Sequence, residues 1–236
     1  MSISTRPSRG ARPKSSRWRG ATTAPSGTLA ETGEWYEARK IILATGLREV
    51  LPAVNGLTEF YGKSLFNCPY CDGWELRDRP LVIISETDHA HHMAKILYNW
   101  SRDLLVCTNG KSVLTAEQKQ SLSRKEIMVE EQRIRALSGR GGQLEKVIFE
   151  DGREAARSGG FVTPLWFPAA PFAEALGCTV NKLGGIMTDA LGRTNVEGVY
   201  AAGDSAIAGA SQLIIAVAEG SKAASGVNFD LTNEDF

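Results

Sequence analysis

The 236-residue sequence predicts an α/β protein with a Rossmann-like parallel sheet, and two stretches carry this prediction. In the first, an apolar run at residues 81–84 is followed by a predicted helix over 88–100 and a second apolar run at 104–107. Strand, helix and strand at this spacing are typical of a βαβ unit, whose strands lie parallel in one sheet. In the second, residues 198–204 indicate a strand that ends in a polar turn, with a helix over 212–225 behind it.

The other expected elements follow from local patterns. Residues 1–28 are rich in Ser, Arg, Pro and Gly and have no helical or strand period, so we expect them to be disordered. Order is expected to begin near Trp35. Residues 39–46 form a short apolar run closed by small residues, which suits a buried strand ending in a tight turn. Two more strands are predicted at 127–129 and within 146–152, with a turn between them and another after the second.

Composition and charge narrow the class of protein. Apolar residues make up 42% of the chain and charged residues 23%, as in ordinary globular domains. The formal net charge is zero, but six of the 27 basic residues precede Glu31, the first acid, which leaves 21 basic against 27 acidic residues. This mildly acidic body argues against a nucleic-acid surface. No run approaches the ~18 consecutive apolar residues of a membrane-spanning helix, and no apolar secretory segment stands near the N-terminus.

The cysteine content indicates a reducing compartment. Four scattered cysteines are too few for a secreted disulfide scaffold; they are Cys68, Cys71, Cys107 and Cys178. We therefore expect a cytoplasmic protein in which a reactive pair performs chemistry. The Arg- and Ser-rich beginning leaves a transit peptide open as an alternative.

A redox centre is predicted at the hexapeptide Cys68-Pro69-Tyr70-Cys71-Asp72-Gly73. Two cysteines at this spacing can close a disulfide ring, and the surroundings can lower the pKa of the attacking thiol. Asp72 stands beside the sulfurs as a candidate proton donor. Half of a zinc site and a pair of buried apolar cysteines remain open on the hexapeptide alone.

Histidines and tryptophans have simpler interpretations. All three histidines lie within residues 89–92, at the start of the predicted helix. Their spacing matches no zinc module, so a solvated cluster is favoured over a metal site, and no metal is predicted. Trp74, Trp100 and Trp166 are interpreted as core or interface aromatics, although Trp74 follows the cysteines closely enough to allow stacking at a cofactor.

Three motifs in order now resemble a known family. They are Ala44-Thr45-Gly46, then the Cys-x-x-Cys-Asp-Gly motif, then Gly203-Asp204 with a helix behind it. From about Ala38 to the C-terminus the sequence resembles the low-molecular-weight thioredoxin reductases and their thioredoxin-reductase-like relatives, which are class II pyridine nucleotide-disulfide oxidoreductases. The resemblance implies a FAD domain interrupted by an inserted NAD(P)-type domain that carries the cysteines. It assigns residues 29–52 and 158–236 to the FAD domain and 53–157 to the insertion.

The resemblance also implies roles for individual residues. Cys71 would be the sulfur that faces the flavin, Cys68 the one that exchanges with the substrate disulfide, and Asp72 the acid–base residue. The expected FAD-binding residues are Thr45, Gly46, Gly203, Asp204, Gln212 and Leu213. A helix beginning at Gln212 would suit the flavin ring, because free N–H groups and the helix dipole stabilise negative charge on a reduced isoalloxazine. The expected partner is a small redox protein or a low-molecular-weight disulfide, and the expected assembly is a homodimer.

The sequence departs from the family pattern in two places. The Gly-x-Gly-x-x-Gly loop that approaches the FAD pyrophosphate is missing, and we expect that roughly eighty residues of the family's first half are absent before Trp35. In the insertion, the dinucleotide loop is replaced by Ser85-Glu86-Thr87-Asp88-His89, and residues 108–111 offer one cation. Two carboxylates where a pyrophosphate would lie make NAD(P)H use doubtful.

These observations predict a thioredoxin reductase-like flavoprotein that transfers electrons between FAD and a substrate disulfide or dithiol through Cys68 and Cys71. The sequence does not fix the direction of transfer. The alternative is a truncated, non-catalytic α/β remnant that cannot hold FAD.

Overall fold

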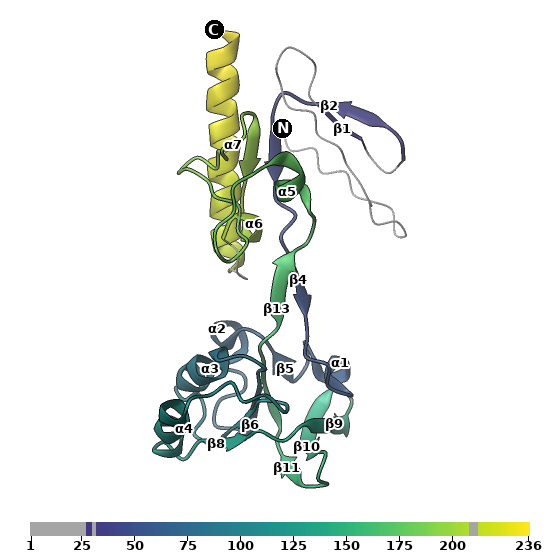
Figure 1. The fold of residues 1–236 in the computed structure, drawn as a ribbon, viewed down its shortest axis with the longest axis vertical. Coiled ribbons are helices and arrows are strands. Elements are labelled where there is room, and N and C mark those ends of the chain that lie inside the picture. The colour runs from purple at the N-terminus through teal and green to yellow at the C-terminus, as the bar shows by residue number, and fades with distance from the viewer. Residues whose placement is uncertain (1–26, 30–31, 208–211) are drawn as a thin grey trace. The chain divides into compact units, whose positions relative to one another are not determined.

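The computed structural model describes residues 27–29, 32–207 and 212–236. The chain divides into two units (Figure 1). The central unit is Glu49–Leu165, and the terminal unit combines Met1–Arg48 with Trp166–Phe236. The chain passes from one unit to the other within two paired strands, β4 (Leu47–Val50) and β13 (Leu165–Pro168).

A five-stranded parallel sheet forms the centre of the central unit. Its order is β5 (Leu65–Phe66), β12 (Gly159–Val162), β6 (Leu81–Ile84), β7 (Leu104–Cys107) and β8 (Met128–Glu130). The predicted βαβ unit is confirmed: α3 (His89–Leu97) connects β6 to the parallel β7. Every residue of β6 and β7 is buried, which explains why both strands are continuously apolar. Gly160 is required in β12, because a Cβ there would lie 2.0 Å from the carbonyl oxygen of Val82.

Different elements cover the two faces of this sheet (Figure 1). On one face, α3 and α4 (Ala116–Ser123) share a core with inward residues of the strands, including Ile83, Val106, Ala94, Leu97 and Leu122. On the other, the antiparallel strands β9 (Ile134–Arg140), β10 (Gln143–Phe149) and β11 (Glu154–Ala156) pack with α1 (Leu57–Phe60). That core includes Val82, Ile84, Leu105, Leu137 and Val147. The alternation of β6 and β7 residues between two cores makes this unit a layered α/β fold.

The terminal unit is built around a short parallel pair, β3 (Ile41–Leu43) and β14 (Val199–Ala201). Its core contains Leu43, Cys178, Ile186, Val199 and Ala201. The remaining elements are the antiparallel pair β1 (Gly27–Leu29) and β2 (Trp35–Glu37), then α5 (Phe172–Leu176), α6 (Asp204–Ile207) and α7 (Leu213–Asp235). The predicted C-terminal helix exists and extends ten residues beyond Ser225, to Asp235.

Helix α7 is fixed along its C-terminal half. A Cβ on Gly226 would lie 2.4 Å from the carbonyl oxygen of Leu191, so the helix backbone approaches this turn closely. Arg193 donates two hydrogen bonds to the Asp230 carboxylate, at 2.7 and 2.8 Å, and the buried Tyr200 hydroxyl donates to the same group. These bonds hold the pKa of Asp230 at about 2, with Arg193 the larger cause and Tyr200 the second.

The units do not coincide with the boundaries expected from the sequence. The expected insertion, 53–157, excludes β12, whereas this strand pairs with both β5 and β6 and lies in the middle of the sheet. The central unit accordingly reaches Leu165. The expectation of disorder over 1–28 falls mostly outside the described residues, and residues 27 and 28 lie in β1. No helix among the described residues has the length and apolar character needed to cross a membrane.

Candidate redox site

Cys68 and Cys71 form a disulfide with their Cα atoms 5.3 Å apart, which confirms that the pair can be bridged. The bond spans the start of a short helix, α2 (Pro69–Asp72), for which Cys68 is the N-terminal cap. The Cys68 carbonyl oxygen accepts hydrogen bonds from the N–H groups of Cys71 and Asp72, at 3.1 and 3.2 Å. Pro69 is the first helical residue, where its fixed φ and missing N–H cost nothing. The sequence therefore brings the sulfurs together by folding one tight turn.

The turn packs against Trp100, three residues after the end of helix α3. Gly73 is buried, and a Cβ at this position would lie 2.9 Å from Cδ2 of Trp100. The Tyr70 ring meets the Trp100 ring edge-on, with centroids 5.9 Å apart. Trp100 itself packs against the core beneath α3, as expected for a structural aromatic. The redox turn is therefore carried on a rigid part of the central unit.

Asp72 has the electrostatic character of a proton donor. Asp72 directly follows Cys71 in the sequence and is half-buried. Burial raises the pKa of its carboxyl group above the usual value, and the negative charge of Glu75 adds to the increase. A carboxyl group that keeps its proton at higher pH can donate it to a departing thiolate.

Trp74 does not pack in the core, one of the two packing roles expected for it, and its role as an interface aromatic stays a prediction. Its side chain is 65% exposed, and the guanidinium carbon of Arg77 lies 4.1 Å from its ring centroid. Trp166 is half-buried in the terminal unit. Trp74 follows the short helix α2, and most of its side chain is exposed.

The turns after β3 and β14 form a second group of site residues, in the terminal unit. Gly46 has φ +71° and Gly203 has φ +66°, values that favour glycine. Ser205 links the two turns: its Oγ accepts a hydrogen bond from the Gly46 N–H at 2.8 Å and lies 3.5 Å from Thr45 Oγ1. The parallel pairing of β3 with β14 places both turns at the same sheet edge. Thr45, Gly46, Gly203 and Asp204 are thus brought together.

Ser205 was missed by sequence reasoning, although it directly follows the Gly203-Asp204 motif. It is 7% exposed, so its hydroxyl is committed to the turn. A small hydroxyl residue after a turn glycine is common, and the signal was too general to single it out.

Helix α7 begins beside these turns with the two remaining predicted residues. Gln212 is its N-terminal cap, and the Gln212 carbonyl oxygen accepts from the N–H of Ile215 at 2.9 Å. A Cβ on Gly203 would lie 3.6 Å from Ala216 Cβ, so the first turn of α7 adjoins the Gly203 turn. Leu213 is 82% exposed. Exposed apolar side chains next to polar turns are suited to an aromatic ring joined to a polar chain.

The Gly46 turn leaves room for a flavin dinucleotide. A Cβ on Gly46 would meet no atom within 4 Å, so its backbone faces open space in which a ligand can approach. The helix N-terminus of α7 adds N–H groups and a positive dipole end. FAD is therefore compatible with the described part of the terminal unit.

The loop after β6, by contrast, does not fit a nicotinamide dinucleotide. Residues 85–88 contain no glycine, and Ser85 is fully buried with its Oγ 3.3 Å from the Thr87 carbonyl oxygen. Glu86 and Asp88 bring carboxylates to the place where this type of fold holds phosphates.

No site for a metal is found among the described residues, in which no three His, Cys, Asp or Glu side chains come close enough to bind one ion. The rings of His89 and His92 lie 5.3 Å apart, and the pKa values of His89 and His91 are lowered mainly by burial. The two cysteines outside the motif, Cys107 and Cys178, are buried free thiols, and burial raises the pKa of each. Neither thiol has the lowered pKa of a reactive cysteine.

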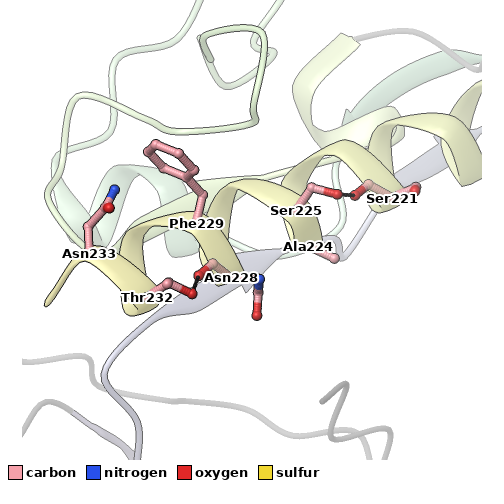
Figure 2. A pocket seen from close by; sticks show the side chains of 7 residues that line it. All are labelled: Ser221, Ala224, Ser225, Asn228, Phe229, Thr232 and Asn233. Carbon is pink, nitrogen blue, oxygen red and sulfur yellow. Dashed lines mark hydrogen bonds between the residues drawn. The ribbon is translucent and has the colours of Figure 1, made fainter. Parts of the chain in front are cut away.

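A hollow on the outer face of α7 does not carry chemistry (Figure 2). All its lining residues come from this one helix: Ser221, Ala224, Ser225, Asn228, Phe229, Thr232 and Asn233. Two of the hydroxyls are satisfied internally, because Ser225 donates to the Ser221 carbonyl and Thr232 to the Asn228 carbonyl. The lining holds no charged group, so the redox turn remains the chemical site.

Comparison with known proteins agrees with this architecture. The family model for pyridine nucleotide-disulphide oxidoreductases matches residues 14–220, a range that contains all three motifs. The crystal structure of TrxB from Bacillus anthracis is 43% identical, with a TM-score of 0.87, over 93% of this chain and 74% of that one. The crystal structure of HlmI is 32% identical, with a TM-score of 0.87, over 94% of this chain and 70% of that one.

Among curated proteins, thioredoxin reductase sirT of Leptosphaeria maculans is 28% identical over 219 residues, which are 87% of this chain. The chain spans 67% of the length of that relative. The chain therefore belongs to the pyridine nucleotide-disulphide oxidoreductase family, a family of flavin-dependent oxidoreductases. Within that family, its relatives and its Cys68–Cys71 disulfide make it thioredoxin reductase-like.

Proposed function

We propose that this protein is a FAD-dependent disulfide oxidoreductase that transfers an electron pair through Cys68 and Cys71. The observation that carries the proposal is the Cys68–Cys71 disulfide at the start of α2, followed directly by a carboxyl group of raised pKa. A disulfide on an exposed turn, in a chain whose two other cysteines are buried free thiols, is suited to exchange rather than to structural bridging.

The residues that would hold FAD are those gathered at the terminal-unit turns. Thr45, Gly46, Gly203 and Asp204 would contact its polar chain, and Gln212 and Leu213 its ring. When bound, FAD would supply a two-electron acceptor and donor for the cysteine pair. Ser205 would act as a positioning residue, because its hydroxyl holds the Gly46 turn.

The chain's own cysteines would perform thiol–disulfide exchange in two steps. In the reduced pair, the Cys68 thiolate attacks one sulfur of a substrate disulfide, forming a mixed disulfide and releasing one substrate thiolate, which takes a proton from Asp72. The Cys71 thiolate then attacks the Cys68 sulfur, which restores the Cys68–Cys71 disulfide and releases the second substrate thiolate. The same steps in reverse oxidise a substrate dithiol.

The partner would be a small redox protein or a low-molecular-weight disulfide or dithiol, and the protein would act as a homodimer in the cytoplasm. The buried free thiols Cys107 and Cys178 suit a reducing compartment. The exposed rings of Tyr70 and Trp74 flank the redox turn and offer an apolar surface to such a partner.

Cysteine variants test this proposal directly. Reduced Cys71→Ser should capture thionitrobenzoate from Ellman's reagent as a stable mixed disulfide on Cys68, detected by intact mass, because the resolving thiol is gone. Cys68→Ser should accumulate much less of the adduct. The converse result would reverse the assigned roles. Anaerobic dithiothreitol should bleach flavin absorbance in the FAD-loaded protein and not in the Cys68→Ser/Cys71→Ser variant. Neither exchange nor flavin binding would indicate a non-catalytic remnant.

A further inference from the structure

The carboxyl edge of the central sheet is where a Rossmann-type fold places a dinucleotide. Here the edge is defined by the register Val162, Ile84, Cys107 and Glu130 across β12, β6, β7 and β8. The loop leaving β6 and entering α3 would meet the phosphates. Such loops use glycine so that backbone N–H groups can approach the ligand, but this loop presents Glu86 and Asp88.

Glu86 is held in place across this edge. Its Oε1 accepts a hydrogen bond from Asn109 Nδ2 at 2.6 Å, so the loop after β6 is tied to the loop after β7. We name this contact the Glu86–Asn109 clasp. A diphosphate entering here would be repelled by a carboxylate that this hydrogen bond already holds in place.

Asn109 cannot easily turn away from Glu86. It is 7% exposed, and its Oδ1 accepts the buried N–H of Ile134 at 2.9 Å, which directs its Nδ2 toward the carboxylate. Its φ of +51° is one that asparagine tolerates better than most residues. The next residue, Gly110, donates its N–H to the Glu131 carbonyl at 2.9 Å. The β7 side of the clasp is therefore rigid.

Two nearby cations are already engaged. Lys119 pairs with Glu131 at 2.6 Å, and Arg153 pairs with Glu130 at 2.7 Å. Within residues 108–111, Lys111 is the one cation, and it is exposed. Arg133, whose side chain lies beside Gly110, is also exposed. The loop after β6 itself, residues 85–88, carries two acids and no base toward a ligand that would carry at least two negative charges.

We infer that the Glu86–Asn109 clasp, together with Asp88, excludes NADPH and NADH from the central unit. The inference rests on the proposed function: the Cys68–Cys71 pair exchanges its electron pair with FAD and with a substrate dithiol or disulfide, and no nicotinamide dinucleotide bound at this edge supplies electrons to it. On this inference, the loop after β6 no longer binds a dinucleotide, whereas the redox turn at Cys68 and Cys71 is retained.

Isothermal titration of the full chain with NADPH and with NADH tests the inference without any turnover. The unaltered protein should show no saturable binding up to about 1 mM. Glu86→Gln/Asp88→Asn, which removes both charges at nearly constant size, should bind NADPH at least about tenfold more tightly than that limit. Glu86→Gly, which removes the clasp as well as a charge, provides a second variant. Glu145→Gln/Glu150→Gln, two exposed acids of the same unit, is the charge-matched control and should not bind.

Micromolar binding by the unaltered chain would overturn the inference, as would the absence of any gain in both loop variants when circular dichroism shows them folded. A gain in the control equal to that in the loop variant would do the same. Reactive thiols and flavin absorbance are recorded on the same samples. If the samples had neither reactive thiols nor flavin absorbance and still did not bind NADPH, the proposed function would be contradicted, while the inference that NADPH is excluded would stand.

Discussion

The indole ring of Trp100 lies against Gly73, two residues past Cys71, so closely that a Cβ on Gly73 would be 2.9 Å from Trp100 Cδ2. The same Cβ would be 2.4 Å from the Pro69 carbonyl oxygen. The residue after Asp72 is therefore glycine because a side chain would not fit. Its backbone conformation does not require glycine, since its φ of −66° is one that any residue adopts. The glycine of the motif serves packing between the redox turn and Trp100, which follows helix α3.

Gly73→Ala should consequently destabilise the protein by about 1–3 kcal/mol, because the added methyl group has to displace a ring or a backbone carbonyl. Urea unfolding measures the loss, and mass analysis after reoxidation should show slower closure of the Cys68–Cys71 disulfide. The matched control is Gly220→Ala in α7, where a Cβ would meet no atom within 4 Å. That change should stabilise the helix by about 0.5–1 kcal/mol. Equal effects of the two substitutions would contradict the packing argument.

Ser205→Ala tests the link between the two turns of the terminal unit. The substitution leaves the half-buried Gly46 N–H without its 2.8 Å acceptor. Loss of this part-buried hydrogen bond should cost about 0.5–1.5 kcal/mol, so thermal unfolding should shift to lower temperature. FAD affinity should fall as well, because the Thr45-Gly46 turn loses its fixed position.

Ser225→Ala is the control for this experiment. Ser225 is exposed on α7 and donates only to the Ser221 carbonyl of its own helix. Its replacement should change the stability by no more than about 0.5 kcal/mol. If Ser205→Ala were as mild as this control, Ser205 would not organise the turns.

The sequence predicted the parallel βαβ unit well because β6 and β7 are buried on both faces and therefore read as unbroken apolar runs. It predicted the redox turn because the motif is local. The strand pair β9 and β10 was largely missed, although Gly141-Gly142 between them is a hairpin signal, with φ values of +59° and +81°. Their half-buried alternation is weaker than a continuous run.

Contacts between distant residues were beyond sequence reasoning. The clasp joins Glu86 to Asn109, and the turn contact joins Gly46 to Ser205, 159 positions away. In both pairs, the sequence around one residue gives no indication of the other. The strand β12 was not predicted for the same reason, because a four-residue strand beginning with two glycines shows little strand character until its neighbours are known.

Asp230→Asn should remove stability in a pH-dependent way. The folded-state pKa of Asp230 is about 2, below its usual 3.8, because Arg193 and Tyr200 donate hydrogen bonds to the ionised carboxylate. Such a group stabilises the folded state fully above about pH 4, and this contribution is lost as the pH falls through 2. The variant should therefore unfold about 1 kcal/mol more easily at pH 7, and its difference from the unaltered protein should shrink toward pH 2.

Thermal unfolding between pH 2 and pH 7 measures this dependence. Asp235→Asn serves as the control, since Asp235 is a more exposed acid on the same helix with one ion pair to Arg39. It should show a smaller and flatter difference. A gap between Asp230→Asn and the unaltered protein that did not narrow at low pH would mean that the carboxylate charge is not what stabilises the end of α7.

Asp72→Asn should trade activity for stability. Burial first, and then the charge of Glu75, raises the pKa of Asp72, so the folded state favours the protonated carboxyl group more than the unfolded state does. The stability that this group contributes is present at low pH and is lost as the pH rises through its raised folded-state pKa. Above that pKa the variant should be more stable than the unaltered protein, and below the usual Asp pKa the two should be equal. Exchange with a small disulfide should slow by about 10²–10⁴-fold, because the leaving thiolate loses its proton donor.

The pH profile of the exchange rate separates this role from a merely structural one. In the unaltered protein the rate should carry a falling limb where Asp72 ionises, and Asp72→Asn should lack that limb. Glu75→Gln keeps the donor but removes the second cause of its raised pKa, so the limb should move to lower pH with little loss of maximal rate. Rapid-quench mass analysis of exchange with cystine, whose leaving alkyl thiolate has an ordinary pKa of ~8.5 and so takes a proton, gives the rates. Urea unfolding at each pH gives the stabilities. An Asp72→Asn variant that retained both the rate and the limb would remove Asp72 from the proton-transfer step.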